Sequence, residues 1–260
     1  MSDRVTIAID NGIADVRLAR PEKHNAIDAG MFTAIEDALA ALNAERNLRV
    51  VVLSGEGPAF CSGLDIASFA GGPEATNPLL QRGDDGLNRV QRVALGWQRL
   101  PVPVIAAVHG AAFGGGMQIA LGADIRLFAA DAKLSVMEVR WGIVPDMGIT
   151  QTLRALVSLD VAKELCFTGR IVEAGEAVRL GLGAGIAEEP RDAAMDMAGE
   201  ITKRSPDAIR AIKQLLNRSW HADEQSGLEL EEQLQRQLLF SPNQVEAVRA
   251  QFEKREPRWT

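Results

Sequence analysis

The 260-residue sequence has little cysteine, no cluster of positive charge and no long apolar run. Its two cysteines, Cys61 and Cys166, lie far apart and predict no disulfide framework, so we expect both thiols to be reduced. No apolar run reaches the length that spans a bilayer, and the first residues show no signal-peptide pattern. These absences predict a cytoplasmic protein without membrane contact.

The charge balance argues against nucleic acid as a partner. The chain has 28 Lys and Arg against 35 Asp and Glu, for a net charge of -7. Nucleic-acid binding relies on clustered cations that replace counterions on phosphates, and this composition does not supply them. A local basic pocket for one phosphate-bearing ligand remains compatible with it. Hydrophobic residues make up 47% of the chain, enough for the core of one large domain or of a core with an appendage.

Short β-prone runs alternate with helical patterns along most of the chain. Residues 5–9 and 13–18 flank Asp10-Asn11-Gly12, a tight-turn signal that predicts a hairpin. Asp28 can cap a helix with an apolar stripe at spacings of three and four residues. Further strands are expected at 50–53, 104–108 and 124–128. This alternation predicts an α/β fold.

Two regions depart from that alternation. Residues 68–86 are rich in Gly, Pro, Asn and Asp and predict a surface loop, either a lid over a site or a loop without a role. From about Arg191 onward the pattern is helical, with helices expected to start at Pro206 and Pro242 and another at 228–239. We therefore divide the chain into a core at 1–190 and a helical region at 191–260, and we detect no internal repeat.

Two glycine-bearing turns, residues 57–65 and 109–118, follow two of the expected buried strands. The second contains Gly114-Gly115-Gly116 at a helix start, where glycine is costly in conformational entropy. One reason to keep it is close approach of the backbone to a ligand, since free N–H groups there favour negative charge such as an oxyanion. Tight packing between helix and strand is the open alternative.

Other chemistries fit these turns less well. A phosphate-binding loop needs Gly-Lys-Ser/Thr where this chain has Gly-Met-Gln, and a dinucleotide turn needs a glycine where it has Ala112. Cys61 has no evident partner base in the local sequence, so we interpret it as a buried structural thiol. His24 and His109 are likewise expected to be structural.

Several segments resemble the enoyl-CoA hydratase/isomerase (crotonase) family, in order and at similar spacing. The segment from Arg20 to Ile27 is similar to the early R-P-x-x-x-N-A-L motif. Residues 59–65 resemble the A-F-C-A/S-G-x-D turn, and 103–110 followed by the glycine triplet resemble the second turn. Further matches are Glu138-Val139, Gly142 to Pro145, Thr168-Gly169-Arg170, Gly181-Leu182 and Phe252 to Arg255.

This resemblance implies a fold of stacked ββα turns, the crotonase-like spiral, followed by a helical C-terminal region that forms homotrimers or hexamers. It implies an acyl-CoA substrate, with CoA arriving as part of it and no metal or redox cofactor. The backbone N–H groups of Leu64 and Gly115 would form the oxyanion hole. Backbone around Ser62, Leu64 and Ile66 would contact CoA, and Lys254 would meet a CoA phosphate.

The chain departs from the hydratase pattern at the acid/base positions. Where family hydratases have two glutamates, this chain has Gln118 and Glu138. An amide can bind a water or substrate but cannot exchange a proton as a carboxylate does. Asp146 falls where dienoyl-CoA isomerases have a catalytic aspartate, although after Pro145 it could instead cap a helix. Glu138 could instead have a surface or ion-pair role, and Trp141 is expected to pack or to line an acyl pocket.

The sequence therefore favours double-bond isomerisation of an enoyl- or dienoyl-CoA, with Glu138 as the acid/base and Asp146 assisting. Hydration of a 2-enoyl-CoA is the second hypothesis. A third is a CoA-thioester binding protein without catalysis, because the acid/base pair is incomplete. An RNA-binding side activity is disfavoured by the acidic balance.

Overall fold

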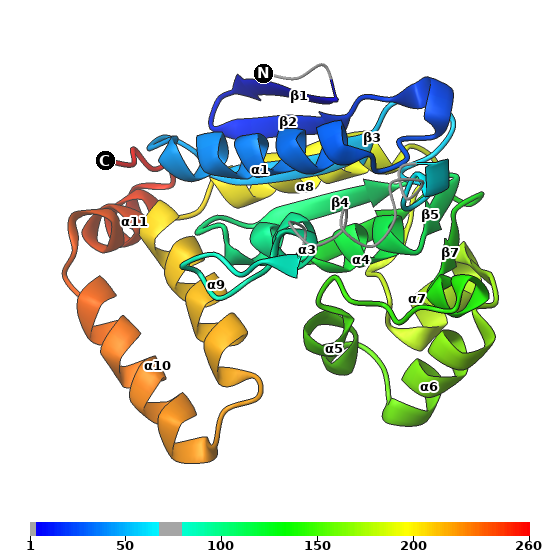
Figure 1. The fold of residues 1–260 in the computed structure, drawn as a ribbon. Coiled ribbons are helices and arrows are strands. Elements are labelled where there is room, and N and C mark those ends of the chain that lie inside the picture. The colour runs from blue at the N-terminus through cyan, green and yellow to red at the C-terminus, as the bar shows by residue number, and fades with distance from the viewer. Residues whose placement is uncertain (1–3, 68–79) are drawn as a thin grey trace.

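The computed structural model describes residues 4–67 and 80–260. In that part, six strands form one sheet in the order β1-β2-β3-β4-β6-β9 (Figure 1). The strands are β1 (Val5–Asp10), β2 (Ile13–Leu18), β3 (Val50–Gly55), β4 (Val104–Val108), β6 (Ile125–Phe128) and β9 (Gly185–Ile186). β1 and β2 pair antiparallel, and the other neighbours pair in parallel. The predicted α/β class is confirmed.

The first hairpin forms where the sequence predicted it. Its turn residues Asn11 and Gly12 have φ values of 49° and 78°. Positive φ at both positions matches the twist of a two-residue hairpin and explains the choice of Asn-Gly. The Asp28 cap is confirmed as well: its side chain accepts a hydrogen bond from the N–H of Met31 at 2.8 Å.

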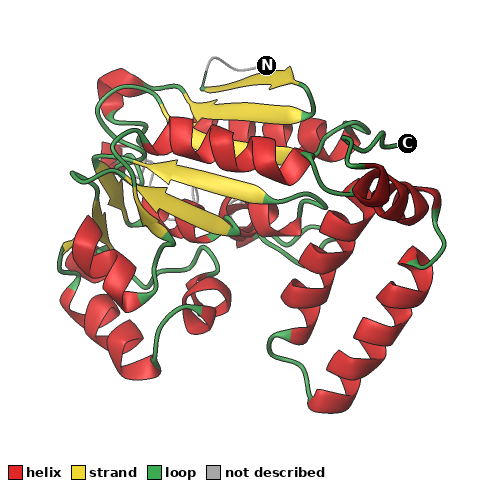
Figure 2. Ribbon diagram, turned by 180° about the vertical axis from the view of Figure 1, so that it is seen from behind, coloured by secondary structure: helices red, strands yellow, loops and turns green. Residues whose placement is uncertain are grey.

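Helices cover both faces of the sheet (Figures 1 and 2). One face carries α1 (Ala29–Ala44), α3 (Arg89–Arg99) and α4 (Gly115–Leu121), and the other carries α8 (Pro190–Thr202). The side chains of β3 alternate between the two cores: Val51 and Leu53 join the first, and Val50 and Val52 pack with Ala194 and Ala198 of α8. This alternation follows from the two-residue period of a strand.

A smaller three-stranded sheet, in the order β5-β7-β8, lies beside one end of the main sheet (Figure 1). Its strands are β5 (Ala111–Phe113), β7 (Lys133–Ser135) and β8 (Val172–Glu173). Around it lie α5 (Ile149–Thr152), α6 (Leu159–Thr168), α7 (Ala174–Leu180) and the short 3₁₀ helices η3 (Glu138–Trp141) and η4 (Leu153–Ala155), while η1 (Pro21–Lys23) follows β2. The second glycine turn enters this sheet through β5.

The last helices are α9 (Pro206–Ser219), α10 (Glu224–Leu238) and α11 (Pro242–Glu253), which extend from the opposite end of the molecule (Figure 1). The expected starts at Pro206 and Pro242 are confirmed. α10 begins four residues earlier than predicted, because Asp223 caps it by accepting from the N–H of Ser226. No helix within the described ranges is long and apolar enough to cross a membrane.

The division at residue 190 stays a prediction, although α8, which follows it, packs on the main sheet as part of the core. The first of the outer helices, α9, is fixed to the core by a buried cation. Lys213 forms an ion pair of 2.7 Å with Asp124 and also donates to the carbonyl of Val102 at 2.8 Å.

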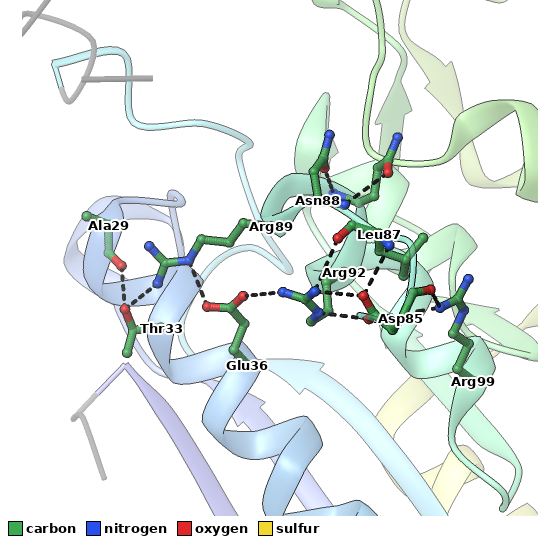
Figure 3. Close-up of polar contacts among 10 residues, drawn as sticks. Ala29, Thr33, Glu36, Asp85, Leu87, Asn88, Arg89, Arg92 and Arg99 are labelled. Carbon is green, nitrogen blue, oxygen red and sulfur yellow. Dashed lines mark hydrogen bonds and ion pairs between the residues drawn. The ribbon is translucent and has the colours of Figure 1, made fainter. Parts of the chain in front are cut away.

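Figure 3 shows an ion-pair network that joins α1, α3 and the segment before α3. Arg92 donates to both oxygens of Asp85, at 2.9 and 2.8 Å, and to Glu36 of α1 at 3.1 Å. Arg89 also bonds Glu36, at 2.7 Å. Of the predicted loop at 68–86, residues 68–79 lie outside the described part, and the network holds its last residues against α3. The lid function stays a prediction.

Candidate functional site

The two glycine turns predicted from the sequence lie against each other. Cys61 and Ala112 form a parallel bridge, in which the N–H of Phe113 donates to the carbonyl of Cys61 at 3.0 Å. A Cβ added at Gly63 would lie 2.7 Å from the carbonyl oxygen of Phe113 and 3.7 Å from the nitrogen of Gly115. The turns therefore form one site.

The glycine triplet is required by geometry. Gly114 has φ 51° and ψ -118°, a conformation that side chains disfavour. A Cβ at Gly116 would lie 2.1 Å from the carbonyl oxygen of Cys61. Tight packing therefore explains the glycine at position 116. At position 114 the glycine is needed for the backbone conformation, which sets the direction of the next N–H.

Two backbone N–H groups are left without an acceptor. The bridge between Ile27 and Leu64 uses the groups on either side of Leu64, since Ile27 donates to Gly63 and Asp65 donates to Ile27. Among the described residues, neither the N–H of Leu64 nor that of Gly115 has a hydrogen-bond partner. Backbone donors without partners are uncommon in folded chains, and here both belong to residues that line a cavity.

That cavity has a volume of about 300 Å³. Its lining is mostly backbone and apolar side chains: Ser62, Gly63, Leu64, Ile66, Gly114, Gly115, Met137, Glu138, Trp141 and Ile143. Glu138 is the one charged side chain among these described lining residues. Trp141 lines the cavity, which is one of the two roles predicted for it. Met137 and Ile143 were missed, because no sequence pattern marks the walls that a short 3₁₀ turn builds.

Glu138 is the first residue of η3 and is only 5% exposed, so the surface alternative is wrong. Its Oε1 accepts a hydrogen bond from Nε2 of Gln118 at 2.7 Å. Its Oε2 is buried and has no partner among the described residues. Burial raises the pKa of Glu138 and the charge of Asp146 adds to this, while the hydrogen bond from Gln118 opposes it. A raised pKa makes the carboxylate a better base near neutral pH.

Gln118 lies behind Glu138 rather than on the cavity wall. Its side chain is almost fully buried, and its Oε1 accepts from the N–H of Met147 at 2.9 Å. Both ends of the amide are therefore used within the protein. The structure does not bring Gln118 into the position of a substrate ligand that the sequence predicted.

Asp146 is exposed and is not among the described lining residues. Protein around its carboxylate still raises its pKa by desolvation, and its charge raises the pKa of Glu138. The capping alternative is wrong, because α5 begins after Gly148 and has no side-chain cap. A catalytic role for Asp146 stays a prediction.

Of the predicted CoA ligands, Ser62 and Ile66 lie at the cavity and Lys254 does not. Lys254 ends α11, which packs on α9 at the far end of the molecule from the glycine turns (Figures 1 and 2). Within one chain it therefore does not meet the CoA site, because the outer helices extend away from the core.

The early motif that includes Arg20 and Asn25 positions the first turn. The Asn25 amide donates to the carbonyls of Glu56, Ala59 and Phe60 at 2.9, 2.8 and 3.2 Å. Arg20 bonds Asp65 at 2.8 Å, at the end of the turn. These contacts explain why the motif accompanies the turn, a role that the sequence alone did not reveal.

Cys61 is fully buried, its Sγ lies 3.1 Å from the carbonyl oxygen of Asn25, and burial raises its pKa to about 12. This confirms a structural thiol. In the described part of the chain, no three His, Cys, Asp or Glu side chains come together as a metal site. A larger hollow of about 530 Å³ lies beside α9, but its lining includes neither glycine turn.

The two glycine turns bring to an apolar cavity two backbone N–H groups that have no partner among the described residues, beside one buried carboxylate. This arrangement is a site for a developing anion in an α/β protein. The sequence profile described as enoyl-CoA hydratase/isomerase matches residues 8–260. The chain therefore belongs to the enoyl-CoA hydratase/isomerase family, and its fold is the crotonase fold that the sequence predicted.

Individual relatives agree with this assignment. The peroxisomal Delta(3,5)-Delta(2,4)-dienoyl-CoA isomerase of Arabidopsis thaliana is 32% identical, over 96% of this chain and 93% of its own. The mitochondrial methylglutaconyl-CoA hydratase of Mus musculus is 30% identical, over 96% and 80%. The crystal structure of an enoyl-CoA hydratase from Bacillus anthracis superposes with a TM-score of 0.91, at 29% identity and 98% coverage of both chains.

Proposed function

We propose that this family member isomerises the double bond of an enoyl- or dienoyl-CoA thioester. The observation that carries the proposal is the acid/base set. Among the described residues that line the cavity, Glu138 is the only carboxylate, and the position beside it carries the amide of Gln118. One carboxyl group can move a proton between two carbons, whereas hydration in the family pattern uses a second glutamate.

The proposed steps use groups that the cavity supplies. The thioester carbonyl accepts hydrogen bonds from the N–H groups of Leu64 and Gly115, which stabilise negative charge on its oxygen. The Glu138 carboxylate removes a proton from C2 of a 3-enoyl thioester, giving a dienolate. The resulting carboxylic acid returns that proton to C4, so the double bond moves to C2–C3 and Glu138 is regenerated.

Asp146 would assist by its charge, because it helps to hold the pKa of Glu138 high. Ser62 and Ile66 would contact the CoA part of the substrate, which supplies CoA without a separate cofactor. A Lys254 that binds a CoA phosphate would come from another copy of the chain, in keeping with the expected homotrimer or hexamer.

Hydration of a 2-enoyl-CoA is the second candidate. It is favoured by relatives whose names are those of hydratases, such as the mouse methylglutaconyl-CoA hydratase. A binding protein without catalysis would show tight CoA-ester binding and no turnover.

The test incubates the protein with 2-enoyl-, 3-enoyl- and 3,5-dienoyl-CoA and follows the products. We expect isomerisation, and we expect Glu138→Gln to lower kcat/KM by about 10²–10⁴-fold while CoA-ester binding survives. Glu188→Gln, an exposed glutamate, is the matched control and should behave as wild type. Hydration alone, no turnover, or unchanged turnover in Glu138→Gln would each refute the proposal. Wild-type rates in Asp146→Asn would remove Asp146 from the mechanism.

A further inference from the structure

The amide of Gln118 has only one possible orientation. The N–H of Met147, which can only donate, lies 2.9 Å from one end of the amide. That end must therefore be the oxygen, and the NH₂ group must face Glu138. The side chain is 1% exposed, so water does not offer an alternative partner for either end.

This orientation constrains the carboxyl group of Glu138. Oε1 lies 2.7 Å from the Gln118 nitrogen and has to accept a hydrogen bond from it. An oxygen that carries a proton toward that nitrogen would meet a second donor. When Glu138 is protonated, the proton is therefore kept off Oε1. The other oxygen, Oε2, is buried and has no partner among the described residues. Glu138 itself is one of the residues that line the cavity.

We propose that Gln118 is a positioning residue that confines the exchangeable proton of Glu138 to Oε2, the oxygen without a hydrogen-bond partner among the described residues. The inference rests on the proposed role of Glu138 as acid/base and deepens it. The same oxygen then takes the proton from one carbon and returns it to another, without a rotation of the carboxyl group between the two steps. This suits an uncharged enoyl chain that lies across a single carboxyl oxygen.

The effect of the Gln118 hydrogen bond can be measured through the pKa of Glu138. Asp146, from the turn before α5, and Cys166, from α6, are the described titratable groups coupled to Glu138 by charge. Burial raises the pKa of Glu138, and the charge of Asp146 adds to this rise. The backbone N–H of Glu138 itself and the hydrogen bond from Gln118 lower the pKa. Loss of that donor while the other groups remain should therefore raise the pKa further.

The decisive variant is Gln118→Met, which has a similar length and no amide. If Gln118 acts through Glu138, the acidic limb of the kcat/KM profile should move to higher pH by about 1–2 units, because hydrogen bonds to a charged group contribute about 1.5–3 kcal/mol. KM for the CoA ester should change little. Gln151→Met, an exposed glutamine on α5, is the matched control and should leave the profile in place.

A role in packing alone predicts a different result, a loss of stability or a change in KM with the acidic limb unmoved, and that result would overturn the inference. The carboxyl ¹³C signal of Glu138, assigned by its loss in Glu138→Gln, measures the same titration without any reaction. A wild-type protein that only hydrates its substrate would refute the proposed function. The carboxyl signal would still test whether Gln118 acts on the titration of Glu138.

A measurement on the wild-type protein covers the case in which Gln118→Met fails to fold. The side-chain ¹⁵N–H signals of Gln118 should shift with the same midpoint as the Glu138 carboxyl signal. They should also remain protected from exchange on both sides of that midpoint. Signals that ignore the ionisation of Glu138, or that exchange freely, would show that the amide does not hold the carboxyl group.

Discussion

Glu138 is a single residue whose burial should oppose folding at neutral pH. Its pKa is raised in the folded protein, so the folded state binds its proton more tightly than the unfolded chain does. Stability from this group is full below the ordinary carboxyl pKa and is lost as pH rises through the raised value. Glu138→Gln, which has no charge to bury, should therefore be more stable than wild type at higher pH.

Thermal unfolding of both proteins between pH 5 and pH 8 measures this effect. The Tm difference should grow with pH, and a gain of ~1 kcal/mol would raise Tm by roughly 2–4 °C for a domain of this size. Glu188→Gln should show no such trend, because its side chain is exposed. A Tm difference that stays constant across this range would show that burial of the Glu138 charge does not oppose folding.

At this scale the sequence predicted backbone positions better than side-chain contacts. Leu64 and Gly115 could be placed at the cavity because the resemblance to the two turns of the family assigned backbone positions, whatever the side chain at position 64. The partners of Gln118 could not be found from the sequence. They depend on the N–H of Met147, 29 residues further along, and on a turn that only the folded chain brings beside α4.

At the scale of elements, α8 shows how a helix packs closely on a sheet. Ala194 and Ala198, four residues apart, are fully buried against the side chains of β3 and β4. Ala198→Leu should destabilise the protein by about 1–3 kcal/mol or more, because the added atoms have no space. On the same helix Gly199 faces outward, and a Cβ there would meet nothing within 4 Å. Gly199→Ala should stabilise by about 0.5–1 kcal/mol.

Urea unfolding of the two variants and of the wild type measures both stability changes. Opposite signs for neighbouring residues would support the assignment of α8 to the core layer. Similar stability changes in both variants, or a tolerated leucine at 198, would mean that α8 does not pack closely on β3 and β4.

The sequence predicted whether the main segments form strands or helices, but it did not predict where some of them begin. The strands β1, β2, β3, β4 and β6 and the helices at Pro206 and Pro242 follow from periodicity and from proline at a helix start. The short strands β5, β7, β8 and β9 were not predicted. The start of α10 depends on the Asp223 cap, in a stretch without an apolar stripe. The chain was divided at 190 because its sequence pattern becomes helical there. The sequence does not show that α8 packs its small side chains on a sheet formed by earlier residues.

At the scale of the whole molecule, a buried cation joins the outer helices to the core. Lys213 is 8% exposed and is held by Asp124 and two carbonyls, while burial lowers its pKa. Lys213→Ala leaves the Asp124 carboxylate without its cation and should cost about 3–5 kcal/mol. Lys203→Ala, at an exposed ion pair, should cost about 0–1 kcal/mol.

Hydrogen exchange distinguishes local from global loosening. In Lys213→Ala we expect faster exchange across α9, α10 and α11, with β3 and β4 still protected. Exchange that rises equally in the sheet, or not at all, would show that this ion pair does not fix the outer helices to the core.

The buried thiol within the first glycine turn can report on the contact between the two turns. Cys61 should resist alkylating reagents while the two turns stay in contact, because its pKa of about 12 leaves almost no thiolate and its surface is covered. Cys166, which is only half-buried, is the other thiol in the chain and provides an internal reference. The labelling rate of Cys61 relative to Cys166 therefore measures how often the cavity wall opens.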